Sequence, residues 1–126
     1  MTVLIVVEDD PDVQLLVETI FSMDSRFGAA EVAHSAEQAL KASIRTKEPA
    51  VIVLDHGLAG ALTGLEAAPR LKELNPNAKI ILFTAHAELR ALADEDPAID
   101  TFLNKTESTQ LLALAQRLSG LNATSA

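Results

Sequence analysis

The sequence contains no cysteine, which excludes disulfide bonds and thiolate metal sites. It also has no tryptophan or tyrosine, and only 4 phenylalanines. Basic residues are scarce, because 10 lysines and arginines stand against 18 aspartates and glutamates and leave a formal net charge of −8. Such a charge repels the DNA backbone and anionic lipid, so we expect this chain to bind neither nucleic acid nor membranes.

Long hydrophobic runs are missing too, since no apolar segment approaches the roughly 20 residues needed to span a bilayer. The first residues carry no basic group and do not resemble a secretory signal, so we expect a cytoplasmic protein. Hydrophobic residues nevertheless make up 48% of the 126 residues, which is enough for one compact domain. We expect that domain over residues 1–120, followed by a short C-terminal tail over residues 121–126.

Five short apolar segments alternate with five helical patterns along the chain. The expected strands are residues 3–7, 29–33, 51–54, 79–83 and 99–103. The expected helices run from Pro11 to about Asp24, from Ala36 to before Pro49, from about Leu65 to Leu74, over about 86–94, and from Thr106 to before Gly120. This alternation predicts an α/β fold, with a parallel sheet covered by helices on both faces.

Several local signals support these helices. Asp10 before Pro11 is a good helix start, so we interpret Asp10 as a cap rather than a ligand. Ser35 and Gln38 have the spacing of a capping box. Pro69 lies inside the third helix and predicts a late start or a kink there. The apolar positions of the first helix share one face, which we expect to be buried: Val13, Leu16, Val17, Ile20 and Phe21.

Polar side chains follow four of the five expected strands, at the point where each strand ends. They are Glu8, Asp9 and Asp10 after the first, Asp55 after the third, Thr84 after the fourth and Lys105 near the end of the fifth. Because the carboxyl ends of parallel strands share one edge of the sheet, we expect these groups to lie close together.

Several carboxylates held close together repel one another unless a cation intervenes, and Mg²⁺ is the hard cation that best suits such ligands. A lysine and a threonine beside them could contact phosphate oxygens. A carboxylate nucleophile with a metal and two such donors predicts a site that accepts a phosphoryl group. Asp55, which ends an apolar strand predicted to be buried on both faces and precedes a glycine-containing loop, is the predicted nucleophile.

These residues resemble those of the receiver domain of bacterial two-component response regulators, of the stand-alone, chemotaxis-regulator-like kind. The resemblance covers essentially the whole chain. It gives Asp55 as the phosphoacceptor and Lys105 as the family's lysine. It gives Glu8, Asp9, Asp55 and the backbone carbonyl of Gly57 as metal ligands, and Thr84 and Phe102 as the switch pair. Lys105 is followed by Thr106, where the family usually has proline.

The resemblance implies a flavodoxin-like fold with strand order 2-1-3-4-5. It implies Mg²⁺ as cofactor, a sensor histidine kinase or histidine phosphotransfer protein as phosphodonor, and a downstream protein target or onward phosphotransfer as output. A receiver of this kind is no turnover enzyme, although it can lose its phosphoryl group slowly by itself. Phosphorylation is expected to turn Phe102 inward, and weak homodimerisation is left open.

Other functions were weighed against the same residues. A haloacid dehalogenase-like phosphatase also uses a strand-end aspartate, but it needs a second aspartate two residues later, where this chain has Gly57. A flavin carrier is disfavoured by the acidic pocket and the lack of tryptophan and tyrosine. The three histidines have no zinc-ligand spacing, and we expect His86 at the mouth of the site. The chain could also be a receiver cut from a hybrid kinase.

Overall fold

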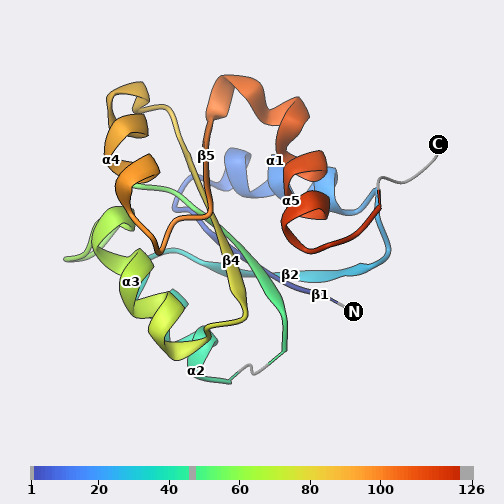
Figure 1. Cartoon of the computed structure of the whole chain (residues 1–126), viewed down its shortest axis with the longest axis horizontal. Coiled ribbons are helices and arrows are strands. Elements are labelled where there is room, and N and C mark those ends of the chain that lie inside the picture. The colour runs from blue at the N-terminus through green and yellow to red at the C-terminus, as the bar shows by residue number, and fades with distance from the viewer. Residues whose placement is uncertain (1, 46–47, 123–126) are drawn as a thin grey trace.

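The computed structural model describes residues 2–45 and 48–122, and the side chains of residues 44 and 45 are not part of that description. Its strands form one parallel sheet in the order β2-β1-β3-β4-β5, which confirms the predicted fold (Figure 1). The strands are β1 (Thr2–Val7), β2 (Phe27–Ala33), β3 (Ala50–Leu54), β4 (Ala78–Thr84) and β5 (Thr101–Asn104).

The helices connect these strands and cover both faces of the sheet. They are α1 (Pro11–Phe21), α2 (Ala36–Arg45), α3 (Gly64–Leu74), α4 (Arg90–Glu95) and α5 (Leu111–Leu118), with two 3-10 segments, η1 (Ala87–Leu89) and η2 (Lys105–Gln110). Helices α1 and α5 lie on one face, and α2, α3 and α4 lie on the other (Figure 1). None of the helices in the described ranges is long and apolar enough to cross a membrane.

The side chains of each strand alternate between two cores. In β1, Leu4 and Val6 pack under α1 and α5, while Ile5 and Val7 pack under α2 and α3. The prediction for α1 was wrong at one position, because Leu16 keeps 42% of its surface exposed. Leu16 therefore belongs to the outer surface of α1, at the rim of the apolar stripe.

Three helix starts can be compared with their predictions, and they agree to different degrees. Asp10 does cap α1, since its carboxylate accepts the Asp12 N–H at 2.9 Å. Ser35 Oγ accepts the Gln38 N–H at 3.2 Å, but the Gln38 side chain accepts from the His34 N–H rather than completing a capping box at Ser35. The late start expected for α3 is wrong, because the helix begins at Gly64, with Thr63 as its N-cap and Glu66 completing a capping box.

The remaining element ends differ from prediction because backbone hydrogen bonds close turns there. Helix α1 stops at Phe21, where the chain turns so that the Asp24 N–H reaches the Phe21 carbonyl at 3.1 Å. Strand β5 begins at Thr101, since the Ile99 N–H is held in a turn by the Asp96 carbonyl. Residues 105–110 form η2 instead of the first turns of α5.

The chain end is tied to the body of the protein. Asn104, not Thr106, caps η2, accepting the Thr106 N–H at 3.0 Å. Leu121 packs against the core under α5, and the Asn122 carbonyl accepts the Arg26 guanidinium at 2.6 Å. The last four residues of the expected tail, 123–126, lie outside the described residues.

Candidate functional site

Three acidic side chains meet at the carboxyl edge of the sheet. One carboxylate oxygen from each of Glu8, Asp9 and Asp55 lies within 4.8 Å of the other two. Glu8 and Asp55 are only 3% and 7% exposed, whereas Asp9 faces solvent. Strands β1 and β3 are direct neighbours, with Val7 opposite Leu54, so their end residues are brought together by pairing alone. The predicted acidic cluster is therefore present.

Lys105 reaches into this cluster from the end of β5. Its Nζ lies 2.7 Å from Glu8 Oε1 and 3.0 Å from Asp55 Oδ2. The other oxygen of each acid is held by backbone: Glu8 Oε2 accepts the Asp9 N–H at 3.1 Å, and Asp55 Oδ1 accepts the His56 N–H at 2.7 Å. These bonds fix the orientation of both carboxylates and leave the ammonium between them.

The electrostatics of the cluster are set by burial. Burial raises the pKa of the Glu8 carboxyl to about 7; the hydrogen bond from Lys105 opposes that rise, and the charge of Asp55 adds to it. Burial alone would lower the pKa of Lys105, but its bonds to Glu8 and Asp55 outweigh that effect and raise it. The lysine is thus held charged, and the site retains more negative charge than one ammonium can neutralise.

Thr84 lies on β4, the strand beside β3, and Phe102 lies on β5, the next strand out. Thr84 ends β4 and is fully buried, and its Oγ1 accepts the His86 N–H at 3.3 Å. Phe102 is 4% exposed and pairs with Leu82 across β4 and β5. Because Leu82 pairs in turn with Leu54 of β3, the Thr84 hydroxyl stands at the same edge as Asp55.

The loop after Asp55 is pinned at several points. The Gly64 N–H donates to the His56 carbonyl at 3.0 Å, and the Leu62 N–H donates to Glu37 Oε1 at 3.2 Å. Gly60 has a φ of +91°, and a Cβ there would meet the Glu37 carboxylate. Backbone hydrogen bonds, from its own amide and from the loop, hold the pKa of Glu37 below its ordinary value. Helix α2 therefore anchors the loop that carries Gly57.

Gly57 and His86 face each other across the mouth of the site. A Cβ at Gly57 would lie 3.9 Å from His86 Nε2, and the His86 ring meets His56 edge-on with centroids 6.0 Å apart. His86 Nδ1 lies 3.2 Å from Glu88 Oε1. His86 thus stands beside the segment that follows Asp55, as the sequence predicted.

Gly64 and Glu37 shape the site, and sequence reasoning missed both. A Cβ at Gly64 would lie only 2.1 Å from the Asp55 carbonyl oxygen, so the chain needs glycine there. A glycine shortly before an apolar helical stripe is a signal that could have indicated this close approach. Glu37 has no comparable signal, because its partner Leu62 lies 25 residues away in sequence.

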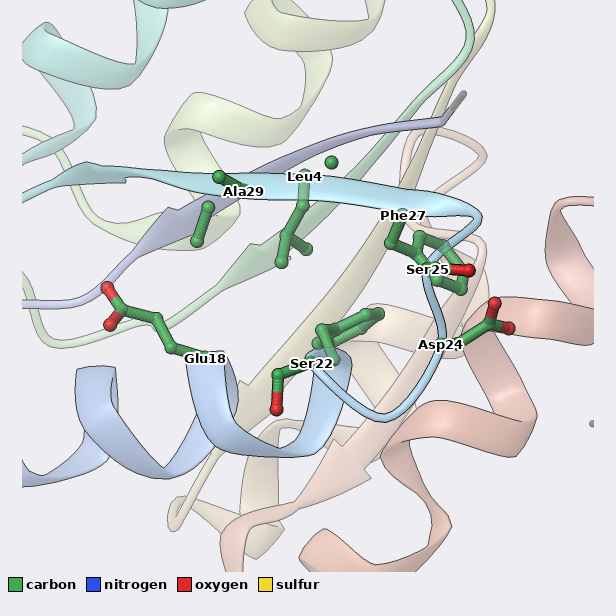
Figure 2. Close-up of a pocket in the computed structure, with 10 residues that line it drawn as sticks. Leu4, Glu18, Ser22, Asp24, Ser25, Phe27 and Ala29 are labelled. Atoms are coloured by element: carbon green, nitrogen blue, oxygen red, sulfur yellow. The ribbon is translucent and has the colours of Figure 1, made fainter. Parts of the chain in front are cut away.

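A separate hollow of about 400 Å³ lies at the opposite edge of the sheet (Figure 2). Its walls come from the end of α1, the turn before β2 and β2 itself, and include Glu18, Ser22, Asp24, Phe27 and Ala29. Asp24 is bonded there to Arg26 at 2.8 Å and to Gln116 at 3.0 Å. The bond from Arg26 holds the pKa of Asp24 well below its usual range. Its bond to Gln116 makes this carboxylate a structural link between the turn before β2 and α5.

The fold and the site together define a doubly wound α/β protein with a buried carboxylate, two neighbouring acids and a lysine at the carboxyl edge of its sheet. Residues 4–116 match the model of the response regulator receiver domain family. The chain belongs to this family, and is a phosphoacceptor of two-component signalling rather than a catalytic enzyme. The phosphatase alternative is therefore not supported. No curated protein matches the chain.

Solved structures show the same architecture. The response regulator TrrA of Thermotoga maritima, solved in complex with Mg²⁺ and BeF, is 26% identical, with a TM-score of 0.79 over 94% of this chain and 99% of TrrA. TrrA has also been solved in complex with the histidine kinase ThkA, with a TM-score of 0.76 at 26% identity over 94% of this chain and 98% of that one. The receiver domain of the histidine kinase PA1611 from Pseudomonas aeruginosa, solved with magnesium in its active site cleft, is 21% identical, with a TM-score of 0.77 over 94% and 98% of the two chains.

Proposed function

We propose that Asp55 is the residue that takes up the phosphoryl group. A carboxylate oxygen of Asp55 attacks phosphorus, the bond from phosphorus to the donor histidine nitrogen breaks, and an acyl phosphate forms. The observation that carries this proposal is Lys105, which bridges Asp55 and Glu8 and can neutralise charge on the incoming group. Thr84, at the same edge, supplies a hydroxyl donor once the phosphoryl group is in place.

The residues present fit a magnesium ion. Glu8, Asp9 and Asp55 supply hard oxygen ligands within 4.8 Å of one another, and the Gly57 carbonyl is the fourth ligand that we propose. Magnesium is present in the structures of TrrA and the PA1611 receiver. When bound, the ion would neutralise the acids and draw charge from the phosphoryl oxygens. The raised pKa of Glu8 also suits a cation site, because a bound cation would favour the charged form of this carboxyl group.

The experiment that tests this function is incubation with Mg²⁺ and a small phosphodonor, followed by intact mass. We expect the protein to gain one phosphoryl group with Mg²⁺ and none in EDTA. A protein that shows no gain at any Mg²⁺ concentration contradicts the proposal.

The protonation of Glu8 gives a pH prediction for stability. The unfolded carboxyl releases its proton near pH 4.5, while the folded one keeps it until about pH 7. Folded protein thus binds more protons in this window, and in EDTA the free energy of unfolding should fall as pH rises between about 5 and about 7. Saturating Mg²⁺ should remove this fall, because the bound ion favours the charged carboxylate.

Urea unfolding at a series of pH values, with EDTA or Mg²⁺, measures this dependence. The Glu8→Gln variant is the control, since it has no proton to exchange and should lose the slope whatever its overall stability. A wild-type slope that matches that of Glu8→Gln in EDTA would show that Glu8 is already charged below pH 7.

We propose that the phosphodonor is a sensor histidine kinase or a histidine phosphotransfer protein, and that it docks on α1. An apolar groove of about 300 Å³ lies between α1 and the start of α5, lined by Leu16, Ile20, Met23, Ser108, Thr109 and Leu112. Leu16 and Met23 are 42% and 67% exposed. Helix α1 begins directly after the acidic cluster, so a donor helix packed along it would reach the rim of the site. TrrA forms a complex with a kinase of this class.

Leu16→Glu should therefore slow phosphotransfer from a protein donor without affecting a small one. With the phosphorylated histidine kinase that transfers fastest to the wild-type chain, we expect KM to rise about tenfold, the size of one lost apolar contact. Leu92→Glu is the matched control, because Leu92 is a 56% exposed leucine on α4. Equal KM values for Leu16→Glu and wild type would exclude the groove as the docking surface.

The output that we propose is phosphorylation-dependent binding of a protein target, or onward phosphotransfer, in the cytoplasm. Thr84 and Phe102 are the proposed switch pair, and new bonds to the phosphoryl group would favour one of two packings of the surface around α4 and η2. The net charge of −8 disfavours nucleic acid and anionic membranes as targets. Residues 1–120 form the proposed receiver unit.

A further inference from the structure

One side chain of α4 spans the surface that links three elements. The guanidinium carbon of Arg90 lies 4.6 Å from the centroid of the Phe102 ring in β5. The same guanidinium lies 3.6 Å from Glu107 Oε1 in η2. Arg90 therefore lies over an aromatic ring and beside a carboxylate at the same time, which the guanidinium group allows.

Helix α4 has few other ties to the body of the protein. It has six residues, no side-chain cap, and Ala93 as its buried residue. The Glu107 end of the contact is also irregular, since Glu107 has non-helical φ and ψ of −109° and 30° inside η2. A short helix and a kinked 3-10 segment are thus joined across β5 by Arg90.

The Phe102 ring is held in place by contacts within the chain. It is 4% exposed and packs in the core under α2, α3 and α4, with Arg90 closing the outer side. A cation over an aromatic ring at an exposed site shifts a two-state population by about two- to fivefold. The charge of Arg90 therefore biases the ring toward its buried position.

The path from the acidic site to Arg90 is short. The Thr84 hydroxyl accepts the His86 N–H at 3.3 Å, and the Leu89 N–H donates to the His86 carbonyl at 3.0 Å. Arg90 follows Leu89 directly. If the Thr84 hydroxyl moves toward a group on Asp55, its hydrogen bond from the His86 N–H either breaks or is kept. If the bond is kept, His86 moves too, and the turn that leads into Arg90 is displaced.

We propose that Arg90 is a positioning residue that sets the balance between the buried and exposed positions of Phe102 and couples η1 to η2. This proposal rests on the proposed roles of Asp55 and Thr84. In it, phosphorylation does not act on the ring directly. It displaces the start of α4, and Arg90 passes that displacement to Phe102 and Glu107.

The chain allows a clean test by fluorine NMR, because it contains only 4 phenylalanines and no other large aromatic residue. With 4-fluorophenylalanine incorporated, Phe102→Leu assigns the Phe102 resonance, and the H₂O–D₂O isotope shift reports ring exposure. Wild type, Arg90→Gln and Arg117→Gln are compared before and after treatment with Mg²⁺ and a small phosphodonor. Arg117 is the control, an exposed arginine on α5.

In unmodified protein, we expect Arg90→Gln to raise the exposed population of the Phe102 ring by about two- to fivefold, with Arg117→Gln unchanged. Modification should shift the Phe102 resonance of wild type. The corresponding shift in Arg90→Gln should be smaller by at least about half, which a merely structural role would not cause. A modified Arg90→Gln protein that responds as wild type does overturns the proposal.

Failure of the proposed function gives a different result. If wild type gains no phosphoryl group by mass, Asp55 is not the acceptor under these conditions, and ring exposure in the unmodified proteins alone decides the role of Arg90. Exposure in Arg90→Gln equal to that of wild type then overturns the proposal. Far-UV circular dichroism of each variant checks that the fold is kept.

Discussion

Asp55→Asn should take up no phosphoryl group from either a small phosphodonor or a kinase. The amide oxygen is a poor nucleophile, and the substitution removes the charge that Lys105 neutralises at 3.0 Å. The side chain keeps its shape, and its oxygen can still accept the His56 N–H, so the fold should survive. We expect a loss of at least about 100-fold in the rate of modification, measured by intact mass over time.

Asp94→Asn is the matched control for this loss. Asp94 lies exposed on α4 and has no part in the acidic cluster, yet the substitution changes the net charge by the same amount. It should leave the rate of modification at the wild-type value. An Asp55→Asn protein that is modified as fast as Asp94→Asn would place the acceptor elsewhere in the chain.

Gly64→Ala should destabilise the protein and disturb the site together. The added Cβ would lie 2.1 Å from the Asp55 carbonyl oxygen and 3.0 Å from the His56 Cα. Both are backbone atoms at the end of β3, so the clash cannot be relieved by a side-chain rotation. We expect a loss of about 2–4 kcal/mol in the free energy of unfolding, measured by urea titration, because overpacked backbone contacts force the chain to move.

Gly57→Ala is the control for this prediction. A Cβ at Gly57 has its nearest neighbour at 3.9 Å, an ordinary contact with the movable His86 ring, and the backbone carbonyl is unchanged. Its stability should stay within about 0.5 kcal/mol of wild type. If both alanine variants were equally stable, the close approach of α3 to Asp55 would not be needed for folding.

The sheet and its acidic edge could be predicted from the sequence because both depend on local patterns. Short apolar segments at regular spacing give strands, and the alternation with helices makes the sheet parallel. Once the sheet is parallel, the residues after each strand share an edge, so Glu8, Asp9, Asp55 and Lys105 meet without further information. No side-chain contact had to be known in advance.

The parts that could not be predicted depend on contacts between distant residues. Leu16 fits the apolar stripe of α1, and only the placement of α5 shows that it is exposed. Glu37 anchors the loop after Asp55 from another helix, and Arg90 covers Phe102 from a helix that the sequence barely defines. The helix ends shifted for the same reason, since caps such as Asn104 compete with Thr106 over a few residues.

The residue that carries the phosphoryl group is the point on which the account depends most. After modification with Mg²⁺ and a small phosphodonor, borohydride reduces an acyl phosphate of aspartate to homoserine, which marks the acceptor permanently. Peptide mass mapping of the reduced protein should find homoserine at position 55 and at no other aspartate. Homoserine at position 9 or 10 instead, or a phosphoryl group that borohydride does not reduce, would contradict the account.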